Sequence, residues 1–258
     1  MRRFLLLLLF VTTLLSIPSL AKRFTFGFRL AKMELDFPHH PEWEGEACPE
    51  LDSILDQPFH FIGKGAQSYV FASKDEKHVV KLFRYDHPSL DSKIVLLFDA
   101  CKMAYDSLKE ETGLVYIHLN PTSIGLPTLQ CKDPVGRNVT FPLDRYRFVI
   151  QKKAIPFRAA LKEAKQNPAE MKKRLDQFLN LLAARTSQGI LNTDPNLSRN
   201  FGFLEGRAIE FDCGNYQKPP HLDRVAEMKR YTCKLRHWLK KHAPEWLPYL
   251  DERVEALS

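Results

Sequence analysis

Long apolar runs are nearly missing from this sequence of 258 residues. The one exception extends from Phe4 to Ile17, which is shorter than the roughly 20 residues that a membrane-spanning helix needs. Two arginines precede this run, and Pro18 and the small-residue end Ser19-Leu20-Ala21 follow it, which is the layout of a secretory signal peptide cleaved after Ala21. We therefore expect residues 1–21 to be a signal peptide and the protein to be secreted or periplasmic. The alternative is a membrane anchor formed by residues 4–21, and membrane contact is expected only in that case.

Cysteine is also scarce and follows no pattern. The five cysteines include no CxxC pair, so cysteine usage settles neither the compartment nor the disulfide state. The 38 Lys+Arg and 31 Asp+Glu residues are scattered along the chain, so we expect no nucleic-acid binding. Internal repeats and low-complexity tracts are missing as well, and 44% hydrophobic and 27% charged residues are typical of a globular protein.

The first half of the chain after the signal reads mainly as strands. Residues 22–57 mix aromatic residues, prolines and acids and are predicted to form an irregular arm. "FHFIGKGAQSYVFAS" and "HVVKLFRY" then predict a strand, a turn and two further strands. A helix opened by Pro88-Ser89 follows, with apolar residues at intervals of three and four up to Leu108. "GLVYIHL" and "YRFVIQK" predict two more strands with a turn-rich connection between them.

The second half reads mainly as helices. Met171, Leu175, Phe178, Leu179 and Leu182 form one apolar stripe of a helix that ends near Gly189. A loop and two short strands joined at Glu205-Gly206 follow, and a last amphipathic helix runs through "LDRVAEMKRYTCKLRHWLKKH" until Pro244 stops it. The sequence therefore predicts an α+β protein with a strand-rich half at residues 58–152 and a mainly helical half at residues 153–258.

Two features of the strand-rich half are suited to binding phosphate. "IGKGAQSYVF" places Gly63, Lys64, Gly65 and Ala66 in a turn between two strands, where backbone N–H groups can approach an anion without obstruction from side chains. Strand rather than helix follows this turn and no GK[ST] is present, so it is neither a dinucleotide fingerprint nor a Walker loop. Lys81 lies inside the apolar strand "VVKLF", where a lysine either faces solvent at an edge or holds anionic phosphates.

Three oxygen-bearing side chains lie in the stretch "GILNTDPNLSRNFGFLEGRAIEFDCGNY". Asp194 lies in a loop after a hydrophobic helix, Asn200 directly precedes "FGF", and Asp212 follows the apolar strand "AIEF". A carboxylate and a carboxamide at adjacent strand ends are suited to binding Mg²⁺ that bridges phosphates. A second carboxylate nearby could accept a proton from a hydroxyl group. Each residue alone also fits a turn or a helix cap.

Taken in order, these motifs resemble those of the protein-kinase-like superfamily. The family has a Gly-rich loop, a strand lysine, a helix acid, a catalytic Asp, a metal-binding Asn and Asp-Phe-Gly. Here they appear as "IGKGAQSYVF", "VVK", "NTDPNLSRN" and "DCG", over about residues 59–216. The resemblance implies a two-lobed fold with a small antiparallel sheet and one helix in the N-lobe and a reduced helical C-lobe. It also implies that Gly63 to Ala66 and Lys81 bind ATP and that Asn200 and Asp212 bind Mg²⁺. The catalytic residues that it implies are Lys81, which holds the phosphates, and Asp194, which is the base.

Several departures from the family pattern indicate an atypical, compact member. Asn192-Thr193 replaces the His-Arg that normally precedes the catalytic Asp, six residues separate Asp194 from Asn200, and Cys213 replaces the phenylalanine of Asp-Phe-Gly. No Ala-Pro-Glu follows, which leaves little room for an activation segment. The helix acid that would pair with Lys81 stays open, with four candidates: Asp99, Asp91, Glu110 and Glu111.

The sequence thus favours a phosphotransferase that transfers the γ-phosphoryl group of ATP to an unidentified hydroxyl acceptor, in a protein, a sugar or a lipid. The alternative is a secreted pseudokinase that binds a nucleotide or a partner, and a remoter alternative is a structural protein that binds no nucleotide.

Glycosylation sequons occur at Asn138 and Asn196. Because a glycan on Asn196 would obstruct the Asp194 loop, a bacterial source is favoured over a eukaryotic secretory route.

Overall fold

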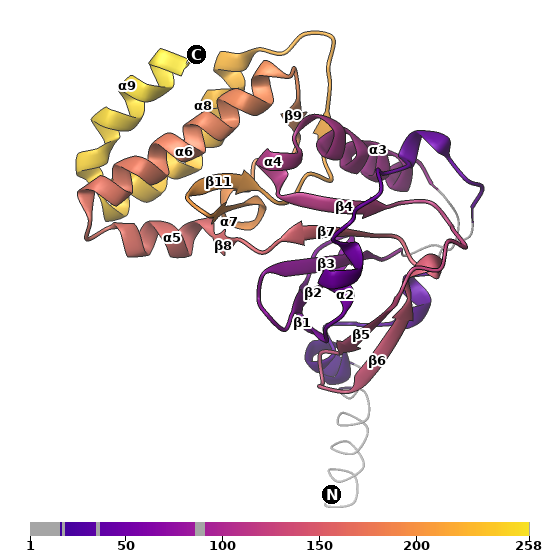
Figure 1. Cartoon of the computed structure of the whole chain (residues 1–258). Coiled ribbons are helices and arrows are strands. Elements are labelled where there is room, and N and C mark those ends of the chain that lie inside the picture. The colour runs from indigo at the N-terminus through magenta and orange to yellow at the C-terminus, as the bar shows by residue number, and fades with distance from the viewer. Residues whose placement is uncertain (1–15, 17–18, 35–36, 86–90, 258) are drawn as a thin grey trace, which may run out of the picture. The chain divides into compact units, whose positions relative to one another are not determined.

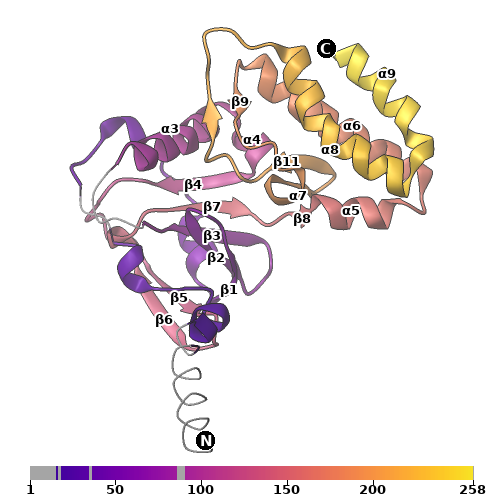
Figure 2. The same ribbon diagram turned by 180° about the vertical axis from the view of Figure 1, so that it is seen from behind.

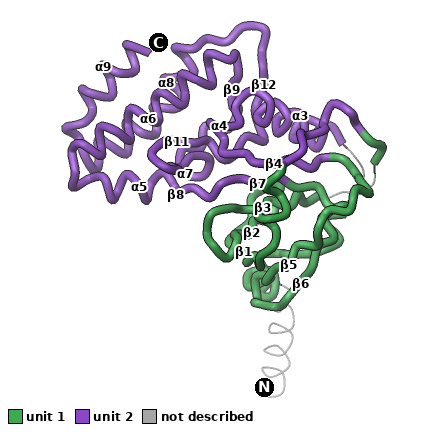
Figure 3. The backbone as a smooth tube through the Cα atoms, in the orientation of Figure 1, with its two compact units in different colours: residues 1–39, 49–90, 120–148 green, residues 40–48, 91–119, 149–258 purple. Residues whose placement is uncertain are grey.

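The computed structural model describes residues 16, 19–34, 37–85 and 91–257. The predicted signal peptide therefore lies almost entirely outside the described residues. The chain forms two compact units, each built from separate segments (Figure 3). Unit 1 comprises residues 1–39, 49–90 and 120–148, and unit 2 comprises residues 40–48, 91–119 and 149–258. Among the described residues, no helix has both the length and the apolar character needed to cross a bilayer.

Unit 1 is a strongly twisted set of strands with short helices (Figure 1). Its strands lie in the order β3-β2-β1-β5-β6, with β1 parallel to β5 and the other neighbours antiparallel. Its elements are η1 (Leu30–Lys32), α2 (Leu51–Leu55), β1 (Phe59–Lys64), β2 (Ser68–Ser73), β3 (His78–Phe83), β5 (Thr128–Lys132), β6 (Asn138–Pro142) and η3 (Leu143–Arg145).

The hairpin of β5 and β6 corrects the predicted turn-rich connection between residues 119 and 146. Leu129 and Cys131 are buried while their neighbours on β5 are exposed, and Phe141 is buried opposite Leu129. The turn forms because the Asp133 carboxylate accepts hydrogen bonds from the backbone N–H groups of Val135 and Arg137 at 3.0 and 2.8 Å. The alternation on these short strands is hidden in the sequence by the many turn-forming residues around them.

Unit 2 contains the long helices, which Figure 2 shows from behind. Its helices are η2 (Pro41–Trp43), α3 (Ser92–Ser107), α4 (Lys109–Thr112), α5 (Phe157–Ala164), α6 (Pro168–Ser187), α7 (Leu197–Asn200), α8 (Arg224–His242), η4 (Pro244–Trp246) and α9 (Leu247–Leu257). Its strands are β4 (Leu114–His118), β7 (Phe148–Lys152, all but its first residue), β8 (Ile155–Pro156), β9 (Leu191–Asn192), β10 (Phe201–Leu204), β11 (Arg207–Glu210) and β12 (Tyr216–Gln217).

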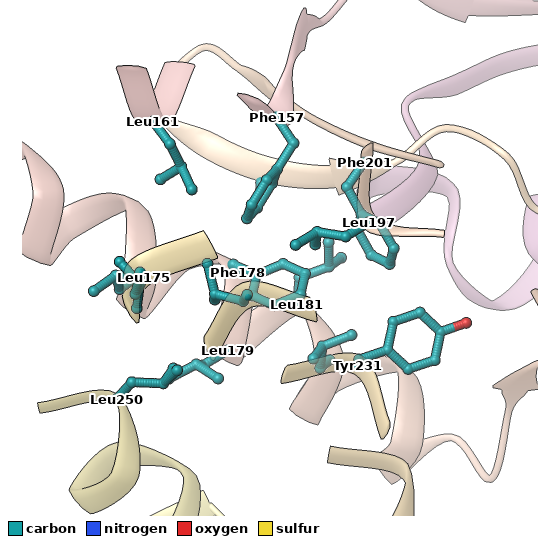
Figure 4. Packing of buried hydrophobic residues seen from close by; sticks show 14 of the residues in the cluster. Phe157, Leu161, Leu175, Phe178, Leu179, Leu181, Leu197, Phe201, Tyr231 and Leu250 are labelled. Carbon is teal, nitrogen blue, oxygen red and sulfur yellow. The ribbon is translucent and has the colours of Figure 1, made fainter. Parts of the chain in front are cut away.

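The core of unit 2 forms around α6 (Figure 4). The apolar stripe predicted from the sequence is buried there, and Phe178 contacts two aromatic rings from other elements. Its ring centroid lies 4.9 Å from that of Phe157 on α5 and 5.3 Å from that of Phe201 on β10. Burial of several such side chains, each contributing about 1.5–3 kcal/mol, fixes the β10–β11 hairpin against α6.

The predicted α+β class is confirmed, with a sheet in the N-terminal half and helices in the C-terminal half. Three details differ from the prediction. Residues 22–57 contain the short helices η1, η2 and α2, the last helix is followed by α9 after Pro244, and α3, α4 and β4 group with unit 2 rather than with the other strands. Helix α3 begins at Ser92 with Asp91 as its N-cap, and Pro88-Ser89 lies outside the described residues.

Gly202 on β10 is required by a close approach of two strands. A Cβ atom at this position would lie 2.6 Å from the carbonyl oxygen of Ile155 on β8 and 3.1 Å from the ring of Phe211. Because the nearest atom belongs to the backbone, it cannot move aside cheaply.

We expect Gly202→Ala to lower the free energy of unfolding by about 1–3 kcal/mol through this overpacking. The matched control is Gly63→Ala, because no atom lies within 4 Å of the added Cβ and Gly63 is not among the residues with positive φ. Urea unfolding of both variants tests this, and equal stability of the two would contradict the proposed close approach.

Candidate functional site

The glycine turn of unit 1 joins β1 and β2. The N–H group of Gly65 donates to the carbonyl oxygen of Ser68 at 2.9 Å, which closes the turn, while Lys64 and Ala66 are exposed. Neither Gly63 nor Gly65 has a positive φ, and an added Cβ would meet no atom closer than 3.6 Å at Gly65 and none within 4 Å at Gly63. The fold of unit 1 does not need glycine at either position, so the open space beside this turn is available to a ligand.

Lys81 lies level with this turn on the same sheet. Gly63 on β1 is paired with Val70 on β2, and Val70 is paired with Lys81 on β3. Residues paired across neighbouring strands project to the same face of a sheet. Lys81 is half-buried, and its neighbours Val80 and Leu82 are buried on the opposite face. Of the predicted phosphate-binding residues of unit 1, Gly63 and Lys81 therefore lie on one face of the sheet.

Three of the four candidate partners of Lys81 have other roles in unit 2. Asp91 caps α3 by accepting hydrogen bonds from the N–H groups of Lys93 and Ile94, both at 2.9 Å. Asp99 accepts a 2.8 Å hydrogen bond from the Trp43 indole. Glu110 forms an ion pair with Arg207. The acid that pairs with Lys81 stays a prediction.

Asn200 and Asp212 lie at the same end of the β10–β11 hairpin. Asn200 directly precedes β10, Asp212 follows β11, and the first ladder pair between them joins Phe201 to Glu210. The backbone N–H of Asp212 donates to the carbonyl oxygen of Asn200 at 3.4 Å. Asn200 and Asp212 are therefore neighbours through their backbones at one end of this hairpin, and the joint role of their side chains stays a prediction.

Asp194 is held against Asn200. The Asn200 side-chain amide donates to the Asp194 carbonyl oxygen at 2.9 Å and to its carboxylate Oδ2 at 3.2 Å. Asp194 also accepts a 2.8 Å hydrogen bond at its carbonyl oxygen from the N–H of Asn196. Three of the predicted site residues thus lie close together in unit 2, and the carboxylates of Asp194 and Asp212 are half-buried.

The side-chain oxygen of Asn200 is the atom that most clearly points to a ligand. Asn200 is 1% exposed, and its Oδ1 has no hydrogen-bond partner among the described residues. An unpaired buried acceptor costs about 1–3 kcal/mol, so such atoms are rare in folded proteins. The amide nitrogen of Asn200 already donates to Asp194. Its oxygen Oδ1 can therefore accept a hydrogen bond from a ligand or bind a metal.

A divalent cation that prefers oxygen fits this set of donors. No cluster of three or more His, Cys, Asp or Glu side chains suited to a metal is found in the described parts of the chain. The donors here are one carboxamide and two carboxylates, which is too few for an all-protein site. Mg²⁺ is usually bound by one or two carboxylates together with substrate phosphates, and it keeps several waters.

A buried ionic network lies behind this site. Arg185 on α6 is fully buried and donates to Glu210 on β11 and, at 2.8 Å, to Glu227 on α8. Glu210 also accepts hydrogen bonds from the Asn192 amide at 2.8 Å and the Tyr216 hydroxyl at 2.9 Å. Two carboxylates and the cation between them thereby join α6, β11 and α8.

The same network fixes the backbone of the Asp194 loop. The Tyr231 hydroxyl donates to the carbonyl oxygens of Asn192 and Asp194 at 2.9 and 3.2 Å, and Arg230 donates to that of Asn192. The Asn192 amide reaches the Asp212 carbonyl oxygen at 3.1 Å, and its Oδ1 accepts from the Asp194 N–H at 2.9 Å. Asn192 therefore links the loop to the segment that carries Asp212.

Burial governs the protonation of the network. Burial raises the pKa of the Glu210 carboxyl, and the charge of Arg185 together with hydrogen bonds from Asn192, Arg185 and Tyr216 opposes that rise. Burial and the charge of Glu210 raise the pKa values of Tyr216 and Tyr231 above the ordinary range. Both hydroxyl groups therefore stay protonated near neutral pH and act as donors.

Two sequence signals of this network were missed. Arg185 occupies the position three residues after Leu182 on the apolar stripe of α6, where a leucine would be expected. Glu210 interrupts the apolar strand "AIEF". A buried charge of each sign on facing elements indicates an ion pair, but neither residue alone identifies its partner.

We expect Glu210→Ala to lower the free energy of unfolding by about 3–5 kcal/mol, because it leaves the Arg185 cation buried with one acid fewer. Asp251→Ala is the matched control, since it breaks an exposed pair with Arg236 that is worth about 0–1 kcal/mol. Urea unfolding measures both effects. Similar small losses in the two variants would show that the network does not hold unit 2 together.

Comparison with solved structures shows a remote likeness of fold. No family model matches the sequence, and no curated protein matches it either. Among solved structures, the chain is similar to the ROP18 kinase domain of Toxoplasma in complex with AMP-PNP and sucrose, at a TM-score of 0.43 and 18% sequence identity. The match covers 68% of this chain and 61% of that domain. This likeness concerns the fold only and is too remote to carry an argument about function.

Proposed function

We propose that the protein is an ATP-dependent phosphotransferase that acts on a hydroxyl acceptor. The observation that supports this most is the buried, unpartnered Oδ1 of Asn200, whose amide binds the Asp194 carboxylate and whose backbone binds that of Asp212 at one end of the β10–β11 hairpin. A metal-binding carboxamide, a metal-binding carboxylate and a separate base are the groups that phosphoryl transfer needs, because it depends mainly on positioning and charge neutralisation.

Asn200 and Asp212 would hold Mg²⁺. The cation, when bound, neutralises the charge of the ATP phosphates. The Asn200 amide binds the carboxylate oxygen Oδ2 of Asp194, so this bond orients Asp194 and leaves Oδ1 to act as a base. Asp194 would accept the hydroxyl proton while the acceptor oxygen forms a bond to the γ-phosphorus. The bond from the γ-phosphorus to the bridging oxygen breaks, and ADP leaves with that electron pair.

In unit 1, the backbone N–H groups of the glycine turn and the ammonium group of Lys81 would bind the phosphates. Two observations support this assignment: Gly63 and Lys81 lie on one face of the sheet, and the space beside Gly63 is open. ATP is the nucleotide that we propose for this chain. We also propose that export through residues 1–21 carries the enzyme to its acceptor.

Turnover of ATP in the presence of Mg²⁺ tests the proposal. We expect Asp194→Asn and Asp212→Asn to lower turnover by roughly 10²–10⁴-fold, because each removes a group that acts in the transition state. Asp251→Asn, an exposed carboxylate on α9, is the control and should retain turnover. Thermal-shift titrations with Mg·ATP should show stabilisation of the wild type that Asp212→Asn weakens.

Two outcomes would contradict the enzyme assignment in different ways. Metal-dependent binding of ATP with background turnover in every variant would indicate the alternative, a pseudokinase that binds nucleotide without transferring phosphate. A wild type that shows no thermal shift at millimolar Mg·ATP would exclude both nucleotide-binding functions.

A further inference from the structure

One face of unit 2 carries positive charges without acid partners. Arg158, Lys162 and Lys165 recur at i, i+4 and i+7 along α5 and its C-cap, so they share one side of the helix. All three are exposed, while Phe157, Ala160, Leu161 and Ala164 bury the opposite side in the core. Glu163 follows Lys162 directly and therefore points to another side of the helix.

The end of α8 adds to this charge. In both views α5 lies beside the end of α8 where the chain passes into η4 (Figure 1, Figure 2), and both helices contribute to one apolar cluster. Lys241 and His242 belong to the last turn of α8. Desolvation and then four positive charges nearby lower the pKa of the His242 imidazole, namely those of Lys241, Lys165, Lys162 and Arg158. We call these five residues the basic face.

Ordinary structural roles do not account for this arrangement. Cations near the C-terminus of a helix are favoured by the helix dipole, which covers Lys162, Lys165 and Lys241 but not Arg158, at the opposite end of α5. Several other arginines of unit 2 have acid partners: for example, Arg174 pairs with Glu170 and Arg253 with Asp176. By contrast, Arg158, Lys162, Lys165 and Lys241 form no ion pair with any described residue.

The surroundings of the basic face point to a flat partner with an apolar layer. Its residues line neither the cavity of about 560 Å³ in unit 1 nor that of about 260 Å³ in unit 2. Trp238 is half-buried, and its ring centroid lies 5.0 Å from that of His242. Ile155, which is 49% exposed, lies three residues before Arg158 in the chain. Tryptophan beside lysine and arginine is the combination that favours a membrane–water interface.

We propose that the basic face binds the headgroups of anionic lipids at a bilayer surface, through Arg158, Lys162, Lys165 and Lys241, with Trp238 at the interface. This contact does not require the apolar segment Phe4–Ile17, and it is independent of the proposed phosphotransferase activity. An anionic bilayer presents a continuous negatively charged surface to the cations of α5 and α8. The boundary of its hydrocarbon layer can accommodate the indole of Trp238. Attraction to such a plane falls off within a Debye length, about 10 Å at 0.1 M salt.

Co-sedimentation of the full chain with vesicles tests the proposal. Vesicles of phosphatidylcholine containing phosphatidylserine should bind the wild type more tightly than vesicles of phosphatidylcholine alone, and added salt should weaken the difference. The triple variant Arg158→Gln/Lys162→Gln/Lys165→Gln should lose on the order of 100-fold of the partition into anionic vesicles. Using the full chain keeps the contribution of the N-terminal segment the same in every variant.

The matched control removes the same charge elsewhere. Lys74, Lys173 and Lys229 are exposed outside the basic face, and their triple replacement by Gln should retain most of the binding. Equal losses in both triple variants, or none in either, would overturn the proposal. A third result would also overturn it: the wild type binds soluble polyglutamate more tightly than anionic vesicles, and only the basic-face variant loses the binding of polyglutamate. An acidic protein segment would then be the partner.

Discussion

The guanidinium of Arg185 is fully buried in unit 2, and the arrangement around it follows from the need to compensate that charge. An isolated cation in the protein interior would cost several kcal/mol, so it is stable only with well-placed acceptors. Glu210 and Glu227 supply them from two other elements, which fixes β11 and α8 relative to α6. Asn192 and the two tyrosines complete the hydrogen bonding of the carboxylates and of the loop backbone. A core of apolar side chains alone would allow small shifts of these elements, whereas the directional bonds of this network do not.

This network has a consequence for the candidate site. Glu210 lies two residues before Asp212 and Asn192 two residues before Asp194, so the bonds that neutralise Arg185 also hold the chain on both sides of the site. On the hairpin itself, the close approach at Gly202 keeps β10, and with it Asn200, against β8. The oxygen donors are thereby organised before any ligand binds, which is what catalysis by positioning requires. In unit 1, Gly63, Val70 and Lys81 are paired across three neighbouring strands, so Gly63 and Lys81 are also held in place by the sheet.

The sequence points to the candidate site residues more directly than to the residues that hold them in place. Asp194, Asn200 and Asp212 could be identified because each is a polar residue beside an apolar strand, and hairpin geometry then places Asn200 and Asp212 together. Lys81 and the glycine turn could be located because strand alternation is strong there. The β5–β6 hairpin was missed because turn residues mask its short alternation, and the partners of Arg185 were missed because they come from elements far apart in the chain. The partner of Lys81 could not be chosen because four acids, Asp91, Asp99, Glu110 and Glu111, follow it in the next segment of the chain, and in the structure Asp91 and Asp99 stabilise α3 and η2.

The central claim is that Asn200 and Asp212 form a metal site whose open donor is the Asn200 Oδ1 oxygen. Anomalous diffraction from crystals grown with Mn²⁺ and a non-hydrolysable ATP analogue tests it directly, because Mn²⁺ shares the oxygen preference of Mg²⁺ and can be located by its own signal. The account predicts a metal peak at coordination distance, about 2.0–2.2 Å, from Asn200 Oδ1 and from a carboxylate oxygen of Asp212. A metal bound elsewhere, or an Asn200 Oδ1 that accepts a hydrogen bond from the protein in that crystal, would contradict it.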